Sequence, residues 1–143
     1  ARIYTPHPGE LGRLLKCPVR EIFTDPIAAA KKVHQGLAVK KYPSIVVVKG
    51  AGTIVHDGNR VFINPTGNPA MATGGMGDVL SGIIAALCGQ TLSPDMAACC
   101  GVYLHGLAAD IIAQQMGVGC YASEVADTIP AARKQFLQKL LEQ

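Results

Sequence analysis

The sequence has 143 residues, of which 49% are hydrophobic and 16% are charged. This length suits about one domain with a sizeable core, and the apolar composition excludes an intrinsically disordered chain. The net charge of +3 comes from residues scattered along the chain, which excludes nucleic acid as the main partner.

The first predicted elements are a strand over residues 1–5 and a helix that begins near Pro8. Proline suits the first turn of a helix, and leucines follow at helical spacing as far as Leu15. A domain seldom opens on a bare central strand. We therefore expect part of the fold to lie upstream of Ala1 or on another chain.

The next segments predict a helix, a strand and a hairpin. The Asp-Pro pair at residues 25–26 is typical of a helix start, and apolar spacing continues to about Val39. The β-branched run over residues 44–49 predicts a strand buried on both faces. Residues 53–56 and 61–64 predict the two strands of a hairpin.

The second half of the chain is predicted to be mainly helical after a loop over residues 64–77. One helix is expected from Asp78 to about Cys88. Another, apolar on nearly every side, is expected from residue 93 to about Met116.

The last segment opens at Ser123 with Glu124. Pro130 is expected to kink or restart it before a terminal helix over residues 133–143. Because strands alternate with helices along the chain, the sequence predicts an α/β layered fold.

The five cysteines indicate a reducing compartment. Their number is odd, they form no Cys-x-x-Cys motif, and no Cys/His cluster has zinc spacing. We therefore expect a cytoplasmic protein with free thiols. The sequence shows no signal peptide and no unbroken apolar stretch of about 18 residues, so no membrane span is predicted.

The decisive stretch for function is TGGMGDVLSG, residues 73–82. Its glycines let the backbone approach a ligand and turn N–H groups toward it, and the following helix start favours a phosphate. We predict an anion hole at Gly75, Met76 and Gly77. The stretch is neither a P-loop, because no Gly-Lys-Ser/Thr follows, nor a Rossmann fingerprint, because Leu80 stands at the third glycine position.

Asp78 directly follows this anion hole, and a carboxylate beside a phosphate makes chemical sense as a base. It can accept the proton of an attacking hydroxyl group while the N–H groups hold the phosphoryl group. A structural interpretation stays open, in which Asp78 caps its helix and the glycines form a tight turn.

The segment NPTGNPAMATGGMGDVLSGIIAALCGQ at residues 64–90 resembles the signature of the NAD(P)H-hydrate dehydratases, a ribokinase-like family related to carbohydrate kinases. TPHPGE at 5–10, VVKGAGT at 47–53 and SPDMAACCGVYLHGLAAD at 93–110 agree in order and content. The resemblance implies a three-layer α/β/α fold with a mostly parallel sheet that lacks its N-terminal part. Residues 1–143 would then be the C-terminal portion of the catalytic domain.

This family repairs NADHX and NADPHX, in which water has added across a nicotinamide double bond of NADH or NADPH. The resemblance implies a lyase that uses ADP or ATP as co-substrate, with Mg²⁺ arriving on the nucleotide. The new hydroxyl is phosphorylated and phosphate then leaves. The resemblance places Asp78 at the reacting hydroxyl as catalytic and substrate-binding residue, and Gly77 at the nucleotide.

The resemblance also assigns the remaining binding residues. His7 lies at the hydrated dinucleotide, and the nucleotide is lined by Lys49, Gly50, Ala51, Gly52 and Thr53. Without the resemblance, Lys49 is a strand-end lysine in water, the glycines form a plain turn and His7 is an ordinary loop histidine.

Other polar residues are given structural roles. We expect Glu10 to be a first-turn helix acid, His105 and Asp110 to be buried and hydrogen-bonded, Asn64 and Asn68 to bond the loop backbone, and His34 and His56 to lie on the surface.

Two other functions stay open. A kinase of the same fold, acting on a sugar or on a vitamin precursor such as hydroxyethylthiazole, would share the anion hole and the base. The second alternative is a half-domain that binds a nucleotide but does not catalyse a reaction. We expect a homo-oligomer with no membrane or nucleic-acid partner. The choice between ADP and ATP, and the presence of an upstream epimerase domain, are left open.

Overall fold

The computed structural model describes residues 1–37, 42, 44–117 and 119–142. The elements of this part of the chain, in order, are β1 (Arg2–Tyr4), α1 (Pro8–Leu15), α2 (Val19–Thr24), α3 (Pro26–Leu37), β2 (Ser44–Val48), β3 (Ile54–His56), β4 (Val61–Ile63), the 3₁₀ turn η1 (Pro69–Met71), α4 (Met76–Gly89), α5 (Pro94–Met116) and α6 (Ala122–Leu141).

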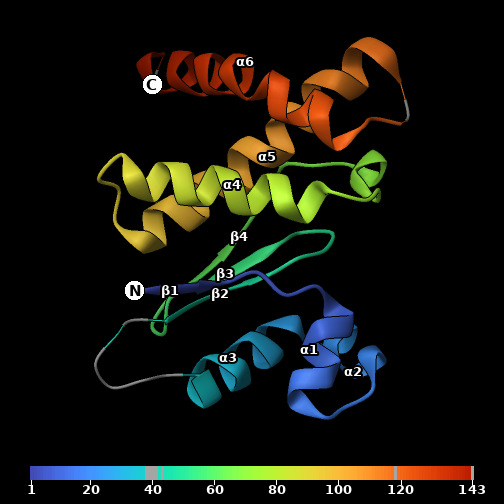
Figure 1. Ribbon diagram of the computed structural model, residues 1–143, viewed down its shortest axis with the longest axis vertical. Helices are drawn as coiled ribbons and strands as arrows, with labels where there is room; N and C mark the ends of the chain where they lie inside the picture. Colours follow the sequence, from blue (N-terminus) through green and yellow to red (C-terminus); the bar gives the residue numbers. More distant parts are fainter. Residues whose placement is uncertain (38–41, 43, 118, 143) are drawn as a thin grey trace.

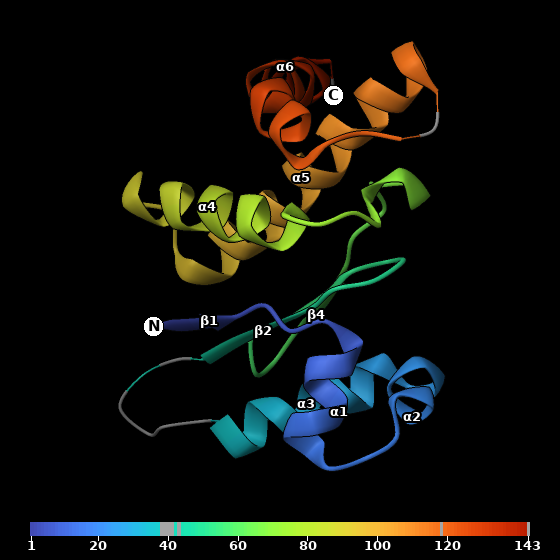
Figure 2. The same ribbon diagram turned by 45° about the vertical axis from the view of Figure 1, so that its right-hand side comes forward.

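The strands form one mixed sheet in the order β1-β2-β3-β4. β1 pairs with β2 in parallel, whereas β2 with β3 and β3 with β4 are antiparallel. Helices α1, α2 and α3 lie on one side of the sheet and α4 and α5 on the other, with α6 beyond them (Figures 1 and 2). The predicted α/β/α layering is confirmed. The prediction of a mostly parallel sheet is wrong for the described strands. The reason is that β3, the first strand of the predicted hairpin, is antiparallel to both of its neighbours, β2 and β4.

Strand β2 is the centre of the core. All five of its residues are buried, and they alternate between two apolar clusters. Val46 and Val48 pack with residues of α1, α2 and α3, while Ile45 and Val47 pack with residues of α4 and α5. Each such side chain contributes about 1.5–3 kcal/mol by its burial. The prediction of a strand buried on both faces is therefore confirmed.

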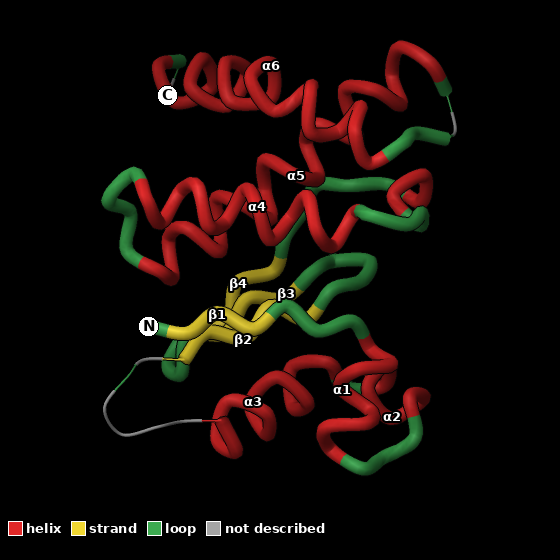
Figure 3. Tube along the Cα trace, in the orientation of Figure 1, coloured by secondary structure: helices red, strands yellow, loops and turns green. Residues whose placement is uncertain are grey.

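Helix α5 is the core helix of the layer above the sheet. Eleven of its 23 residues are buried, and it contacts α4, α6 and three strands. Among the described helices it alone has the length and mean hydropathy, 1.5, of a membrane-spanning segment, yet 61% of its apolar window is buried inside the fold. Figure 3 shows it enclosed between other helices and the strands, so its apolar surface is explained by packing.

The sequence predicts the start of α3 correctly but places the start of α4 two residues too late. The Asp25 carboxylate accepts the N–H of Ala28 at 2.8 Å, so this residue caps α3 as expected. The predicted end of α3 near Val39 lies outside the described residues. Helix α4, in contrast, begins at Met76 rather than at Asp78, because Gly75 adopts a φ of 85° and forms the N-cap. Asp78 therefore lies inside the first turn.

Of the two alternatives predicted at Pro130, a kink or a restart, the restart is wrong. Helix α6 runs continuously through Pro130 and starts at Ala122, one residue earlier than expected, with the Tyr121 N–H donating to the Glu124 carboxylate at 2.7 Å. Pro130 lacks an N–H for the carbonyl of Ala126, but both residues are exposed, so water can satisfy that carbonyl. Buried Val125 and Ala132 hold the helix on either side of the proline.

The histidine pair is not on the surface, in contrast to the prediction. His56 ends β3 and is only 4% exposed, and His34 of α3 is partly buried with its ring centroid 5.1 Å from that of His56. Helix α3 packs against β3, which is why both rings are enclosed. Burial, and then the neighbouring His34, lower the pKa of His56.

Candidate active site

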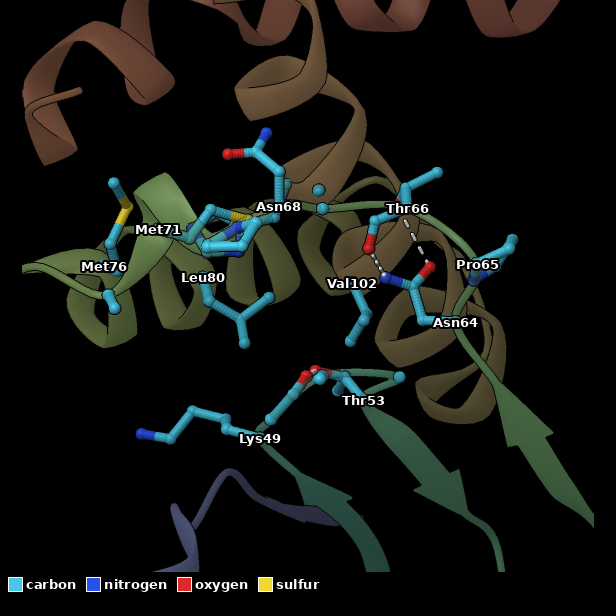
Figure 4. Close-up of a pocket in the computed structure, with 18 of the residues that line it drawn as sticks. Lys49, Thr53, Asn64, Pro65, Thr66, Asn68, Met71, Met76, Leu80 and Val102 are labelled. Carbon is cyan, nitrogen blue, oxygen red and sulfur yellow. Dashed lines mark hydrogen bonds between the residues drawn. The ribbon is translucent and has the colours of Figure 1, made fainter. Parts of the chain in front are cut away.

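A cavity of about 510 Å³ lies between the turn after β2, the loop after β4 and the start of α4. Its wall contains every residue predicted to bind the nucleotide, namely Lys49, Gly50, Ala51, Gly52, Thr53 and Gly77. Figure 4 shows Lys49 and Thr53 on one wall, with Met71, Met76 and Leu80 across from them. An apolar interior with a few polar groups at its wall is typical of a small-molecule site.

The turn from Lys49 to Thr53 is closed by hydrogen bonds between the Thr53 side chain and the backbone of Gly50. The Thr53 hydroxyl donates to the carbonyl of Gly50 at 3.0 Å and accepts the N–H of the same residue at 3.3 Å. Gly52 has a φ of 69°, a conformation that favours glycine. This part of the wall is therefore pre-formed rather than left to be ordered by a ligand.

The first turn of α4 presents free hydrogen-bond donors at the cavity. The N–H groups of Asp78 and Val79 both donate to the carbonyl of Gly75 at 3.1 Å. Those of Met76 and Gly77 have no acceptor in the described part of the chain, and both residues line the cavity. Gly75 is the N-cap and lies outside the cavity wall. Two of the three residues of the predicted anion hole therefore meet the cavity at a helix N-terminus, which favours an anion.

Lys49 extends its ammonium group to the same place. A Cβ atom added to Gly77 would lie 3.1 Å from Nζ of Lys49, so the missing side chain allows this approach. A cation and the positive end of a helix thus converge, an arrangement suited to a phosphate group.

Asp78 is exposed to solvent beside this convergence. It follows Gly77 in the first turn of α4 but is not part of the cavity wall. The carboxylate is therefore accessible from outside the cavity.

His7 forms the N-cap of α1 in a capping box with Glu10. Its Nδ1 accepts the N–H groups of Gly9 and Glu10 at 3.0 and 3.3 Å, and Glu10 accepts the N–H of His7 at 2.7 Å. This hydrogen bond from the His7 backbone lowers the pKa of Glu10. The prediction of Glu10 as a first-turn acid is confirmed. Because Nδ1 is an acceptor, the neutral His7 ring carries its proton on Nε2.

Two further contacts involve residues 5–10, one with Lys49 just after β2 and one with Ser81 in α4. Oε2 of Glu10 lies 3.9 Å from Nζ of Lys49. The hydroxyl oxygens of Thr5 and Ser81 are 3.5 Å apart, and Ser81 donates to the carbonyl of Gly77 at 2.8 Å. The sequence did not predict Thr5 or Ser81, because only the fold brings them together.

The loop after β4 is held by its own asparagines, as predicted. Asn64 donates to the carbonyl of Thr66 at 2.9 Å (Figure 4). Asn68 accepts the N–H of Ala70 at 3.0 Å. Asp110 is partly buried and accepts two hydrogen bonds from this loop, so its expected hydrogen-bonded role is confirmed.

His105 departs from its expected role. It is buried, only 7% exposed, and lines the cavity. Its Nε2 has no hydrogen-bond partner within the described residues, so the predicted hydrogen bonding is wrong for this atom. Burial lowers the pKa of His105 to about 4, which keeps the ring neutral at physiological pH.

Gly106 sets how closely the cavity loop approaches α5. A Cβ atom at this position would lie 2.7 Å from the carbonyl carbon of Thr66 and 2.8 Å from the nitrogen of Gly67. Because both are backbone atoms, Gly106→Ala is expected to displace the loop and lower the free energy of unfolding by about 1–3 kcal/mol.

Urea unfolding measures this cost. Gly82→Ala in α4 is the matched control, since nothing lies within 4 Å of its added Cβ, and it should stabilise the helix by about 0.5–1 kcal/mol. Equal stability of Gly106→Ala and the unsubstituted protein would contradict the close approach.

A profile of the family described as NAD(P)H-hydrate dehydratase matches residues 1–131. The chain belongs to this family. The resemblance seen in the sequence motifs is thereby confirmed for family membership. The bifunctional NAD(P)H-hydrate repair enzyme of Escherichia coli (strain K12) is 49% identical over 131 residues, which are 90% of this chain and 24% of that enzyme.

Solved structures of NAD(P)H-hydrate dehydratases and their relatives share the fold. The ADP/ATP-dependent enzyme of Bacillus subtilis, co-crystallised with ATP/Mg²⁺ and soaked with CoA, matches with a TM-score of 0.86 and 34% identity, over 94% of this chain and 48% of that one. A ribokinase-like superfamily protein of Enterococcus faecalis matches with a TM-score of 0.76 and 31% identity, over 94% and 44%. The ribokinase-like fold is confirmed, and the chain spans about half of each of these two structures and a quarter of the E. coli enzyme.

Proposed function

We propose that the protein containing this chain is an ADP- or ATP-dependent NAD(P)H-hydrate dehydratase that restores NADH or NADPH from NADHX or NADPHX. One observation carries the proposal. The exposed carboxylate of Asp78 stands beside free N–H groups and the Lys49 ammonium, at the edge of a cavity large enough for a nucleotide.

In the proposed reaction the terminal phosphoryl group of the nucleotide is held by the N–H groups of Met76 and Gly77 and by Lys49. Asp78 accepts the proton of the hydrate hydroxyl, whose oxygen forms a bond to phosphorus while the bond to the nucleotide's bridging oxygen breaks. Phosphate then leaves carbon, and loss of a proton from the adjacent carbon restores the double bond. Phosphorylation helps because hydroxide is a poor leaving group and phosphate is a good one.

The proposed positions of the two ligands follow from the walls of the site. The nucleotide takes the cavity along Lys49–Thr53, and the hydrated dinucleotide takes the side of His7 and Asp78. Because Nδ1 of His7 accepts backbone N–H groups, Nε2–H of the exposed ring is the donor available to this second ligand. The ligand would compete for this donor with the Glu10 carboxylate, whose Oε1 lies 3.6 Å from Nε2.

Mg²⁺ is proposed to enter with the nucleotide phosphates. No group of three His, Cys, Asp or Glu side chains suited to hold a metal gathers in the described ranges. These residues would fit an ion that keeps most of its waters and is carried by the nucleotide, and the Asp78 carboxylate, which directly follows the anion hole in the sequence, would be available to its water shell.

We also propose several properties of the whole protein. We propose that residues 1–143 are the C-terminal portion of the ribokinase-like domain, that the protein is a cytoplasmic homo-oligomer and that an epimerase domain accompanies the dehydratase. The bifunctional name of the E. coli relative and the share of it that this chain covers support the last of these.

The direct test mixes the full-length protein with NADHX or NADPHX, ADP or ATP, and Mg²⁺. Recovery of the reduced-nicotinamide absorbance band, dependent on nucleotide, is expected. Accumulation of a phosphorylated product without elimination would instead indicate a kinase of the same fold. Nucleotide binding without any turnover would indicate a non-catalytic domain.

A further inference from the structure

One face of α5 is fitted to the loop that forms the far wall of the cavity. Tyr103, Gly106 and Asp110 are spaced by three and four residues, so they share this face. The carbonyl of Tyr103 accepts the Thr66 hydroxyl at 2.9 Å, and Gly106 leaves room for the backbone of Thr66 and Gly67. The loop is thus in contact with α5 along two helical turns.

Asp110 makes the strongest of these contacts. Its Oδ2 accepts the backbone N–H of Gly67 at 2.9 Å, and its Oδ1 accepts the side-chain amide of Asn68 at 2.9 Å. The other end of the Asn68 amide accepts the N–H of Ala70, which fixes which atom of that amide faces Asp110. Both carboxylate oxygens therefore have a defined donor, and hydrogen bonds to a charged group are stronger than those between neutral groups.

The bonded residues belong to the cavity, whereas Asp110 does not. Thr66, Gly67 and Asn68 line the cavity, and Asp110 lies behind them. Gly67 has a φ of 102°, a conformation open to glycine but avoided by most residues, so the path of the loop depends on glycine at this position.

We propose that Asp110 is a positioning residue for nucleotide binding: it holds Gly67 and Asn68 so that the loop keeps the cavity in its binding shape. This inference rests on the proposed use of the cavity for ADP or ATP. Asp110 touches neither ligand, so its loss should raise the KM and Kd for the nucleotide while leaving kcat at saturating nucleotide nearly unchanged.

The test compares Asp110→Asn in the full-length protein with the unsubstituted protein. The new amide can accept from Gly67 but then faces the Asn68 amide donor to donor. We expect the Kd for ADP to rise about tenfold, the scale of one hydrogen bond to a charged group. In nucleotide-free protein, hydrogen exchange at the Gly67 amide should speed up by a similar factor, about tenfold.

A reciprocal swap, Asn68→Asp with Asp110→Asn, is the matched control. In the swap, the amide at position 110 accepts the Gly67 N–H and donates to the carboxylate at position 68, which also accepts the N–H of Ala70. Net charge is unchanged, so exchange at Gly67 should return close to the original rate. For the swap, hydrogen exchange is measured instead of nucleotide affinity. The carboxylate at position 68 adds a negative charge to the cavity wall, which would itself change the affinity for a nucleotide. If Asp110→Asn alone fails to fold, the swap should fold, and its failure to do so overturns the inference.

The outcomes separate this inference from the proposed function. If the unsubstituted protein binds neither ADP nor ATP, the proposed function is wrong and the link to nucleotide falls with it. If the unsubstituted protein binds ADP and Asp110→Asn binds it equally well, only the inference about Asp110 is wrong. Unchanged exchange at Gly67 in Asp110→Asn also overturns it.

Discussion

Replacement of Asp78 with asparagine is expected to lower kcat by about a hundredfold or more, the usual scale for loss of a general base. The amide keeps the size of the carboxylate but cannot accept the hydroxyl proton. Asp78 is exposed, so the substitution should leave the fold intact. Its position outside the cavity wall predicts that nucleotide affinity changes far less than kcat.

The measurement is steady-state turnover of NADHX with ADP or ATP, together with calorimetric binding of both ligands. Asp127→Asn is the matched control, because Asp127 is an exposed acid on α6 with no hydrogen bond or ion pair to the described residues. A variant at Asp78 that binds both ligands and retains full turnover would show that this carboxylate is not the base.

The second large effect concerns stability at mildly acidic pH. The folded-state pKa of His105 is about 4, below its ordinary value of 6.5, because the ring is buried. Between these values the unfolded chain binds more protons than the folded one, so protonation favours unfolding. The stabilising contribution is complete above about pH 6.5 and is lost as the pH falls toward 4, by about 3 kcal/mol in total.

Urea unfolding at a series of pH values tests this dependence. In His105→Leu, about 3 kcal/mol of the loss between pH 6.5 and pH 4 should disappear, because leucine has a similar size and does not titrate. His105→Gln, which also stays neutral, should behave in the same way. His56 shifts in the same direction, so part of the slope should remain in both variants. If both retain the whole slope, burial of His105 is not its cause.

Most elements could be predicted because local signals agree with the tertiary structure. The β-branched run of β2 and the Asp25 cap of α3 each work through neighbouring residues. Helix α2 was missed because its six residues bury only Ile22, which gives no periodic pattern. Pro130 misled because contacts on both sides of it outweigh its local tendency to end a helix.

The candidate site also has a part that local sequence signals predict and a part that they do not. The residues of Lys49–Thr53 and Gly77 lie in short motifs that carry the family resemblance, and the fold brings them to one cavity as that resemblance implies. The support behind them depends on partners distant in sequence. Gly67 and Asp110 are 43 positions apart, and Thr5 and Ser81 are 76 apart. Such pairs leave no local pattern, so a single sequence does not reveal them.

The pair formed by Lys49 and Glu10 couples the binding of the two ligands in the proposed reaction. Glu10 also fastens the backbone of His7, so one carboxylate connects the edge of the nucleotide cavity with the loop on the other ligand's side. A phosphate arriving at Lys49 competes with Glu10 for the ammonium group and changes what holds that loop. Linkage is reciprocal, so whatever factor the first ligand imposes on the affinity of the second, the second imposes on the first.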